Sequence, residues 1–406
     1  MQGYAITMGN IFSDRISDVP RSFIREILKL GVDESVISFA GGLPNRDLFP
    51  VEEIKKATIK LLDEAGKDVL QYSSTEGFID LREWIADRYR SKHVHVHPDN
   101  ILITSGSQQG MDLLGKTLLN DGDSVIIEEP GYLGAIQAFS IYKATFHPVP
   151  VDEEGIKLDA FHAAVSNHVV KLCYCVPNFQ NPSGISYSEE NRKSIAHILK
   201  GRQTILVEDD PYGELRFLGK AKSSFHQLIP EHTVLLGSFS KTVVPSFRIG
   251  WIVAGHQIME KLVIAKQASD LHTNYFGQRI ISQYLKDNDI DEHISKIRYA
   301  YGRQRDAMVT AIQEFFPKEV GYTHPEGGMF LWITLPGQLS AMEVFKEAVR
   351  QKVAFVPGDP FYVNRKDVNT LRLNYSSLDE ETIRIGIKRL GNVLNTMLAA
   401  KITSNG

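Results

Sequence analysis

Short apolar runs alternate with longer helical patterns through the first two thirds of this chain. Six of the runs are ILITSG (101–106), SVIIEE (124–129), KLCYCV (171–176), TILVED (204–209), TVLLGS (233–238) and GWIVAG (250–255). Near-continuous apolar strands separated by helices are typical of a parallel sheet that helices cover on both faces. The pattern therefore predicts an α/β chain on a mainly parallel sheet, with ligands bound beyond the ends of the strands.

The pattern changes after about residue 290. We expect a long helix from near His293, the apolar runs MFLWITL, KVAFVPG and TLRLNYS, and a closing helix from Glu380 to Ala400. This order predicts a smaller α+β domain. We therefore assign residues 50–290 to a large domain, and residues 1–49 and 291–406 to an N-terminal segment plus the small domain. The N-terminal segment shows no strand and is expected to pack on the small domain or across a dimer interface.

Composition and charge exclude several classes of protein. The 45 basic and 49 acidic residues give a formal charge of -4 without a long run of either sign, so neither nucleic acid nor a membrane surface is an expected partner. No apolar stretch approaches the roughly 20 residues of a membrane span, and the N-terminal residues lack signal-peptide order. Cys173 and Cys175 form neither a CxxC pair nor a disulfide framework. We expect a cytoplasmic protein.

Lys241 lies just past the end of an apolar run, in SFSKT, and Arg248 follows seven residues later. A lysine at a strand end reaches into a cleft, and burial beside cations lowers its pKa toward the neutral amine that forms a Schiff base with an aldehyde. The hydroxyls of Ser238 and Ser240 and the Arg248 guanidinium suit a phosphate dianion. The alternative is a surface lysine.

Asp209 and Asp210 end another apolar run, and Tyr212 follows them in EDDPY. A buried carboxylate needs a positive partner, and a protonated pyridine nitrogen would supply one while the ring acts as an electron sink. The phenol of Tyr212 then suits an oxygen on that ring. The alternative is a solvated acidic turn.

Two further segments follow strand ends. Ser107 and Gln108 begin a helix, where free amides and the helix dipole favour an anion, although an ordinary helix cap has the same sequence. Tyr132, in EEPGY, suits stacking on a flat ring or simple packing.

The remaining candidate site residues carry amide or guanidinium groups. Asn178 and Asn181 in PNFQNPSG are donors for a ring oxygen, although Asn, Pro and Gly also form turns unaided. Arg372, inside the run TLRLNYS, is suited to grip a carboxylate, and an internal salt bridge is the alternative.

Three histidines, His93, His95 and His97, alternate in KHVHVHP. Three imidazoles on one side of an extended segment would suit a metal ion. The segment is polar and brings no carboxylate or thiol, so we interpret it as a solvated connector and expect no metal site.

Nine motifs together resemble the fold-type I pyridoxal-phosphate enzymes of aminotransferase class I/II, in the branch of 2-aminoadipate and kynurenine aminotransferases. They are SFAGGLPNRDLFP, LQYSSTEG, TSGSQQG, EEPGY, NPSG, EDDPY, SFSKT with Arg248 at plus seven, PEGGMFLW and LRLNYS, in family order. The resemblance covers nearly the whole chain. It implies an aspartate aminotransferase-like fold with a seven-stranded, mainly parallel sheet in the cofactor-binding large domain, pyridoxal 5'-phosphate as cofactor, and a homodimer with shared active sites.

The resemblance also assigns roles to single residues. It implies that Lys241 binds the cofactor as an imine, that Asp209 pairs with the pyridine nitrogen, and that Tyr132 stacks on the ring. Tyr212 and Asn181 would bind the ring oxygen. The phosphate would be held by Ser107, Gln108, Ser238, Ser240 and Arg248, with Tyr72 reaching over from the second subunit. Arg372 and Asn181 would bind the substrate carboxylate, and Ser22, Arg25, Gly41 and Gly42 are candidates for recognition of its side chain.

The implied activity is transfer of an amino group between an L-amino acid, of 2-aminoadipate, glutamate or aromatic type, and a 2-oxo acid such as 2-oxoglutarate. A β-lyase that uses the same cofactor and a non-catalytic cofactor-binding sensor are the alternatives. One departure from the family pattern is NPSG in place of NPTG, and the bulky Phe179 before it is expected at the pocket wall. The first change is conservative, and Phe179 leaves the choice of substrate open.

Overall fold

A central sheet carries most of the chain in this computed structural model, which describes residues 12–17, 19 and 35–404. The sheet consists of β2 (Ile101–Thr104), β9 (Gly250–Val253), β8 (Thr233–Ser238), β7 (Ile205–Asp209), β6 (Val170–Cys175), β3 (Ser124–Glu129), β4 (Thr145–Asp152) and β5 (Gly155–Ile156), in that order. The strands from β8 to β4 are parallel, whereas β9 is antiparallel to both neighbours and β5 to β4. The predicted mainly parallel sheet is confirmed, and the two-residue β5 adds an eighth strand to the seven expected.

Alternation along the strands divides the core between the two faces of the sheet. In β6, Leu172 and Tyr174 belong to one buried cluster, whereas Cys173 and Cys175 belong to another. Successive side chains of a strand point to opposite faces, so a strand that is apolar throughout must be covered on both. The two cysteines therefore point the same way, as predicted, and both are buried free thiols.

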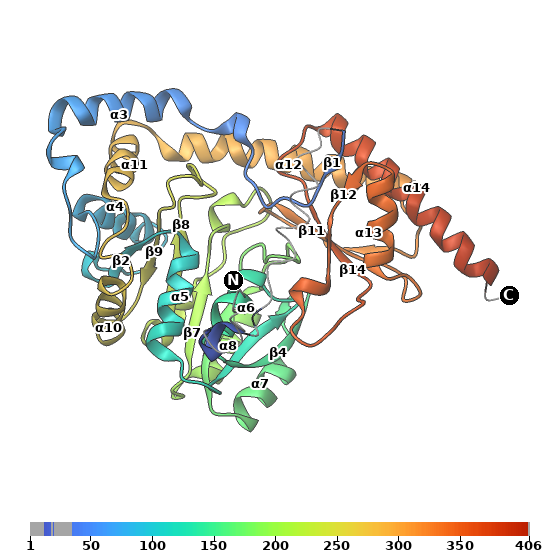
Figure 1. The fold of residues 1–406 in the computed structure, drawn as a ribbon, viewed down its shortest axis with the longest axis horizontal. Coiled ribbons are helices and arrows are strands. Elements are labelled where there is room, and N and C mark those ends of the chain that lie inside the picture. Colours follow the sequence, from blue (N-terminus) through green and yellow to red (C-terminus); the bar gives the residue numbers. More distant parts are fainter. Residues whose placement is uncertain (1–11, 18, 20–34, 405–406) are drawn as a thin grey trace, which may run out of the picture.

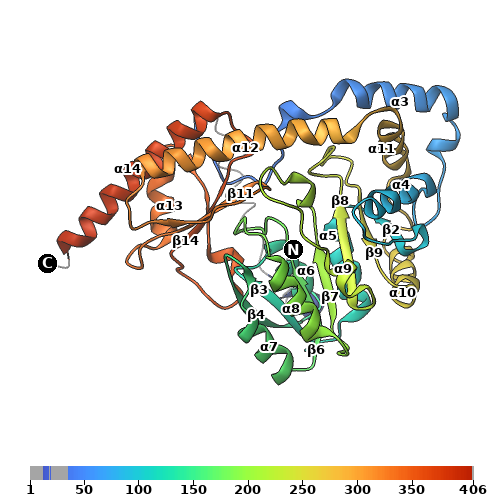
Figure 2. The ribbon, with the colours of Figure 1, turned by 180° about the vertical axis from the view of Figure 1, so that it is seen from behind.

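Helices cover both faces of this sheet (Figures 1 and 2). On one face pack α5 (Ser107–Leu118), α6 (Leu133–Ser140) and α10 (His256–Gln267). On the other pack α7 (Leu158–Asn167), α8 (Glu189–Leu199) and α9 (Phe225–Leu228) near β6 and β7, and α4 (Ile79–Arg90) and α11 (Tyr275–Asp287) near β2 and β9. The helix α3 (Val51–Ala65) lies against α11.

The long helix α12 (Ile290–Phe315) runs from the large sheet to a smaller antiparallel one (Figure 1). The small sheet has the order β10 (Gly321–Tyr322), β11 (Phe330–Thr334), β14 (Thr370–Asn374) and β13 (Val356–Pro357). It is accompanied by α13 (Ala341–Arg350) and by α14 (Glu380–Ser404), which packs on α12. The predicted α+β region is therefore present, and its first helix begins three residues before the expected His293.

The N-terminal segment corrects one expectation, because it does contain a strand. β1 (Ile37–Ser38) pairs in parallel with β12 (Val353–Ala354) beside the small sheet. The pairing joins residues more than 300 positions apart, and two residues carry no readable alternation of their own. From β1 the chain continues through residues 39–45 toward the large sheet.

The remaining described elements are short. They are α1 (Asp14–Ser17) and the 3-10 helices η2 (Arg46–Leu48), η3 (Asp68–Leu70), η4 (Pro98–Asn100), η5 (Gly213–Leu215), η6 (Pro230–His232) and η7 (Asp359–Phe361).

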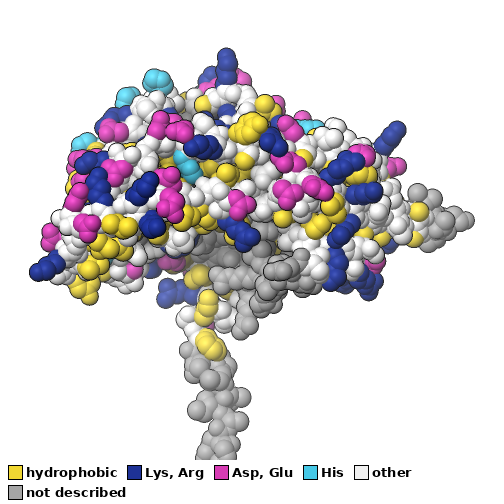
Figure 3. Space-filling view, turned by 90° about the horizontal axis from the view of Figure 1, so that it is seen from above, with side chains coloured by type: hydrophobic (Ala, Val, Ile, Leu, Met, Phe, Trp, Pro, Cys, Tyr) yellow, Lys and Arg dark blue, Asp and Glu magenta, His cyan; other side chains and the backbone are white. Residues whose placement is uncertain are grey.

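Basic and acidic side chains are interspersed on the face seen in Figure 3, without a large field of one sign. In the described part of the chain, no helix is long and apolar enough to cross a membrane.

Candidate active site

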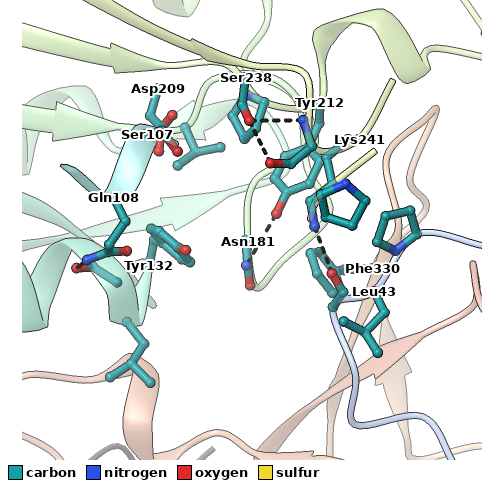
Figure 4. A pocket seen from close by; sticks show the side chains of 18 of the residues that line it. Leu43, Ser107, Gln108, Tyr132, Asn181, Asp209, Tyr212, Ser238, Lys241 and Phe330 are labelled. Atoms are coloured by element: carbon teal, nitrogen blue, oxygen red, sulfur yellow. Dashed lines mark hydrogen bonds between the residues drawn. The ribbon is translucent and has the colours of Figure 1, made fainter. Parts of the chain in front are cut away.

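A cavity of about 440 Å³ opens where the parallel strands end. Twelve of the predicted site residues line it: Gly42, Ser107, Gln108, Tyr132, Asn181, Asp209, Tyr212, Ser238, Ser240, Lys241, Arg248 and Arg372. Eight of these residues are labelled in Figure 4, together with Leu43 and Phe330. The figure shows Asp209, Ser107 and Tyr132 on one side of the cavity and Lys241 and Phe330 on the other. The carboxyl ends of parallel strands meet at one edge, so residues far apart in sequence converge there.

Asp209 is the last residue of β7 and is buried. Its Oδ2 accepts a hydrogen bond of 2.6 Å from the Tyr174 hydroxyl, whereas its buried Oδ1 has no partner among the described residues. Burial raises the pKa of this carboxyl to about 7, with Tyr174 opposing and Asp210 adding to the shift. An unpaired buried carboxylate oxygen calls for a donor, preferably a cationic one.

Lys241 projects from the segment after β8 toward the N-terminal segment. Its Nζ donates to the carbonyl oxygen of Gly42 at 2.8 Å. Burial, and then the positive charges of Arg372 and Arg248, lower the pKa of this amine to about 8. A substantial fraction is therefore neutral near pH 8, which nucleophilic attack and proton abstraction require.

Arg372 lies in the middle of β14 and is buried. Its guanidinium donates to Asn181 Oδ1 at 2.8 Å and to the carbonyl oxygen of Ala40 at 2.9 Å, and its Nε has no partner among the described residues. The ring of Phe330 lies 4.3 Å from its central carbon. Burial lowers the pKa of Arg372 to about 10. Both acceptors are neutral, so the alternative of an internal salt bridge does not apply to the described residues. The guanidinium is therefore suited to bind an anion.

Hydroxyls, amides and a second guanidinium form a cradle at the other end of the cavity. The Ser238 hydroxyl donates to Ser240 Oγ at 2.9 Å, and Ser107 begins the twelve-residue helix α5. Arg248 Nη1 lies 3.5 Å from Ser240 Oγ. Gly106 has φ +77°, and a Cβ there would collide with the Arg248 guanidinium. Glycine thus lets the helix start approach the cation, a combination suited to a phosphate.

The aromatic candidates flank this cradle. Burial raises the pKa of Tyr132 to about 12 and that of Tyr212 further still, so both phenols keep their protons at neutral pH. The Tyr212 hydroxyl accepts from Asn181 Nδ2 at 3.5 Å, which leaves its own proton for another acceptor.

The structure does not bring all candidates into the cavity. Gly41 is adjacent to its lining but not part of it, and Tyr72 is 78% exposed, with its ring perpendicular to that of His272. Ser22 and Arg25 lie outside the described residues.

The segment PNFQNPSG requires two corrections. Asn178 donates to Asp210 Oδ1 at 2.9 Å instead of facing the cavity. Phe179 is fully buried, beneath Gly327 and Gly328, and does not form the pocket wall.

The three histidines are exposed, whereas Val94 and Val96, which alternate with them, are buried. In the described ranges, no three His, Cys, Asp or Glu side chains come together as a metal site would require.

Several functional residues were missed from the sequence. Tyr174 orients Asp209 from the neighbouring strand, and the rings of Phe330, in β11 of the small sheet, and Phe361, in η7, lie against Arg372. Leu43, Leu133 and Gln137 also line the cavity. For Tyr174 a signal existed, since it is the one hydroxyl-bearing side chain in the apolar run KLCYCV.

The chemistry of these groups fits pyridoxal 5'-phosphate. A pyridine N–H would satisfy Asp209 Oδ1, the cradle would take the phosphate, and the Lys241 amine is suited to the aldehyde. With the strand order and the site at the strand ends, they define an enzyme that depends on this cofactor and has the aspartate aminotransferase-like fold predicted from the sequence.

Comparison with known proteins identifies the family. Residues 34–390 match the model of aminotransferase class I and II, and the chain belongs to this family. It is 42% identical to aromatic-amino-acid aminotransferase 1 of Thermococcus litoralis, over 94% of each chain. It is 41% identical to the 2-aminoadipate transaminase of Thermus thermophilus, over 97% of this chain and 99% of that one. The crystal structure of Pyrococcus horikoshii kynurenine aminotransferase matches with a TM-score of 0.91 at 41% identity, over 96% of this chain and 98% of the other. The chain is therefore a pyridoxal-phosphate-dependent aminotransferase.

Proposed function

We propose that this aminotransferase moves an amino group from an L-amino acid, of 2-aminoadipate, glutamate or aromatic type, to a 2-oxo acid such as 2-oxoglutarate. The observation that carries the proposal is the buried guanidinium of Arg372, which is held by two neutral oxygens. Such a cation gains most from a ligand carboxylate, which amino acids and 2-oxo acids share. The similar proteins named for aromatic amino acids, 2-aminoadipate and kynurenine support the same range.

Each chemical task of this reaction has a candidate residue in this chain. Pyridoxal phosphate, when bound, supplies an aldehyde and an electron-accepting ring. Arg372 and Asn181 would orient the substrate carboxylate, and Lys241 would remove and return the α-proton as a general base. Asp209 would hold the proton of the pyridine nitrogen, for which Tyr174 keeps its carboxylate in place.

The cofactor would be held along its whole length. Tyr132 would stack on the ring, and Tyr212 and Asn181 would bind its oxygen. Ser107, Gln108, Ser238, Ser240 and Arg248 would hold the phosphate.

Tyr72 would complete the phosphate site of a second subunit. Its 78% exposed side chain lies near the exposed Leu70, which supports a homodimer with shared sites. Light scattering tests this proposal, and an active monomer would contradict it.

The lining of the cavity bears on which substrate side chain, and so which amino donor, the enzyme prefers. Besides the predicted residues, the lining includes Leu43, Leu133, Gln137 and the rings of Phe330 and Phe361. The cations among the lining residues that the structure describes are Lys241, Arg248 and Arg372. We assign a distal carboxylate to Arg25, with Ser22, Gly41 and Gly42 as further candidates for side-chain recognition, whereas an aromatic side chain is suited to the apolar lining.

A panel of amino donors with 2-oxoglutarate tests the proposal. Purified enzyme is given 2-aminoadipate, glutamate with a different acceptor, phenylalanine or kynurenine, and the oxo acid and amino acid products are measured by mass spectrometry. Arg25→Gln is the companion variant. A selective loss of 2-aminoadipate turnover in this variant would assign Arg25 to the distal carboxylate. Ammonia and pyruvate from a cysteine conjugate without an acceptor would indicate the β-lyase, and cofactor binding without turnover of any donor would indicate the sensor.

We also propose a cytoplasmic location and two domains, residues 50–290 and residues 1–49 with 291–406. The two buried free cysteines fit a reducing compartment. Cell fractionation tests the location, and hydrogen exchange tests whether the two parts open separately.

A further inference from the structure

A buried lysine lies directly behind the turn that begins α5, outside the cavity. Lys266, near the end of α10, has a fully buried side chain. Its Nζ donates to both oxygens of Asp270, at 2.8 and 3.0 Å, to Gln109 Oε1 at 3.1 Å and to Thr273 Oγ1 at 2.9 Å. A lysine is rarely buried in full, because removing an ammonium from water is costly unless it is paired and hydrogen-bonded.

The acceptors of Lys266 are tied to the turn between β2 and α5. Gln109 Oε1 also accepts from the backbone N–H of Ser105 at 2.7 Å, and Gln109 Nε2 donates to Asp270 Oδ2 at 2.7 Å. Thr273 Oγ1 donates to the carbonyl oxygen of Ile103 at 3.2 Å. The ammonium thus holds the turn at Ile103, Ser105 and Gln109, on both sides of Gly106.

The opposite side of this turn faces the proposed phosphate cradle. Ser107 and Gln108 line the cavity, whereas Gln109, Lys266 and Asp270 do not. Gly106 lies against the Arg248 guanidinium, so the turn is clamped between one cation in front and another behind.

The charges of Lys266 and Asp270 also affect how well an anion binds at the cradle. The Asp270 carboxylate lies 3.4 Å from Ser105 Oγ, two residues from the helix start. Without Lys266, its negative charge would stand directly behind a site for a phosphate dianion. Like charges repel and so disfavour binding, and a partly buried pair is screened less than a surface pair.

We propose that Lys266 is a positioning residue for the phosphate end of the cofactor. It fixes the turn that presents Ser107 and Gln108, and it neutralises Asp270 behind them. This inference rests on the proposed placement of the phosphate in the Ser107 and Arg248 cradle.

The test compares ligands that differ only in the phosphate. Apo-protein is titrated with pyridoxal phosphate and with pyridoxal, and inorganic phosphate is used as a competitor. In Lys266→Met, the Kd for pyridoxal phosphate and the competition constant for phosphate should rise about tenfold, as expected for the loss of one buried coupling. The Kd for pyridoxal, and the KM for the amino donor at saturating cofactor, should change less than about twofold.

Two further variants distinguish the effects of misfolding, of a displaced turn and of an unneutralised charge on phosphate binding. Gln109→Met removes the link to Ser105 without removing a charge, and it should weaken phosphate binding by a smaller factor. Adding Asp270→Asn to Lys266→Met should restore part of the affinity. Lys261→Met, an exposed lysine on the same helix, is the matched control and should match the wild type. Circular dichroism and melting of the apo-proteins verify folding.

Two results would overturn the inference. One is an unchanged Kd for pyridoxal phosphate in folded Lys266→Met and Gln109→Met, and the other is an equal loss of pyridoxal affinity. Arg248→Ala distinguishes this failure from that of the proposed site. If Arg248→Ala does not weaken pyridoxal phosphate binding, the phosphate lies elsewhere and the placement itself is wrong.

Discussion

Two groups of charged side chains flank the segment from Asp209 to Glu214, and they differ in how completely their charges are paired. In front, Asp209, Lys241 and Arg372 face the cavity, and two of them keep a buried polar atom without a partner in the described chain. Behind, the Glu214 carboxylate accepts from Arg88 at 3.1 and 3.2 Å and also contacts Lys92 and Arg298. Similar residue types therefore stabilise the fold where they neutralise one another and prepare a ligand site where they do not.

The largest expected effect is that of Lys241→Ala. Loss of the general base should lower kcat by about 10³-fold or more, because proton transfer by a positioned side chain contributes roughly 10² to 10⁴ and the attachment point is lost as well. The melting temperature of the apo-protein should not fall, since a buried cation with a lowered pKa is removed. Steady-state kinetics and calorimetry measure both. Lys261→Ala is the surface control, and full turnover by Lys241→Ala would refute the assigned role.

Arg372→Met should have the next largest effect. Removing the guanidinium should lower kcat/KM by about 100-fold, since a buried charged partner of a carboxylate contributes roughly 2 to 5 kcal/mol. Most of the loss should appear in KM for both the amino and the oxo acid. Arg384→Met, which breaks an exposed pair with Glu314, is the control. A variant with normal KM values would place the carboxylate elsewhere.

Asp209→Asn should stabilise the apo-protein by roughly 2 kcal/mol above pH 7, because it removes a buried charge whose pKa is raised. The folded pKa is about 7 and the ordinary value is 3.8, so the wild-type protein gains stability as the pH falls between them. The advantage of the variant should therefore shrink toward pH 4. Urea unfolding at several pH values measures it, and an advantage that grows at low pH would contradict the assignment.

Glu214→Gln should have the smallest effect, and it should lower the stability of the folded protein instead of raising it. The carboxylate is 22% exposed, and its loss leaves Arg88 still paired with Asp291 at 2.9 Å, so we expect about 1 kcal/mol of destabilisation. Turnover at a permissive temperature should change little. A large fall in kcat with normal stability would show that this paired cluster also serves the reaction.

Twelve residues that the sequence singled out line one cavity, most of them because they stand where strands end. Asp209, Ser238 and the start of α5 each follow an apolar run, and parallel strands bring such ends together. Tyr174, Phe330 and Phe361 were missed because their position depends on register between strands and on how the small sheet meets the large one. Neither is visible in local periodicity.

Physical reasons also explain why some strands were not predicted from the sequence. β4 contains Pro148 and Pro150, which normally argue against a strand with neighbours on both sides. It is tolerated next to the sheet edge, where β5 covers only its last two residues. The two-residue β1 and β5 are too short for alternation to be recognised.

The contacts made by residues 40–42 bear on how this enzyme's substrate scope can be engineered. Ala40 and Gly42 hold Arg372 and Lys241 through main-chain carbonyls, which every amino acid provides. Gly42 itself has little room, since a Cβ there would lie 3.2 Å from the Phe330 ring. The neighbouring Leu43 is 60% exposed and lines the cavity with its side chain. A mutant library at Leu43 would vary the shape offered to incoming side chains while both cations stay in place.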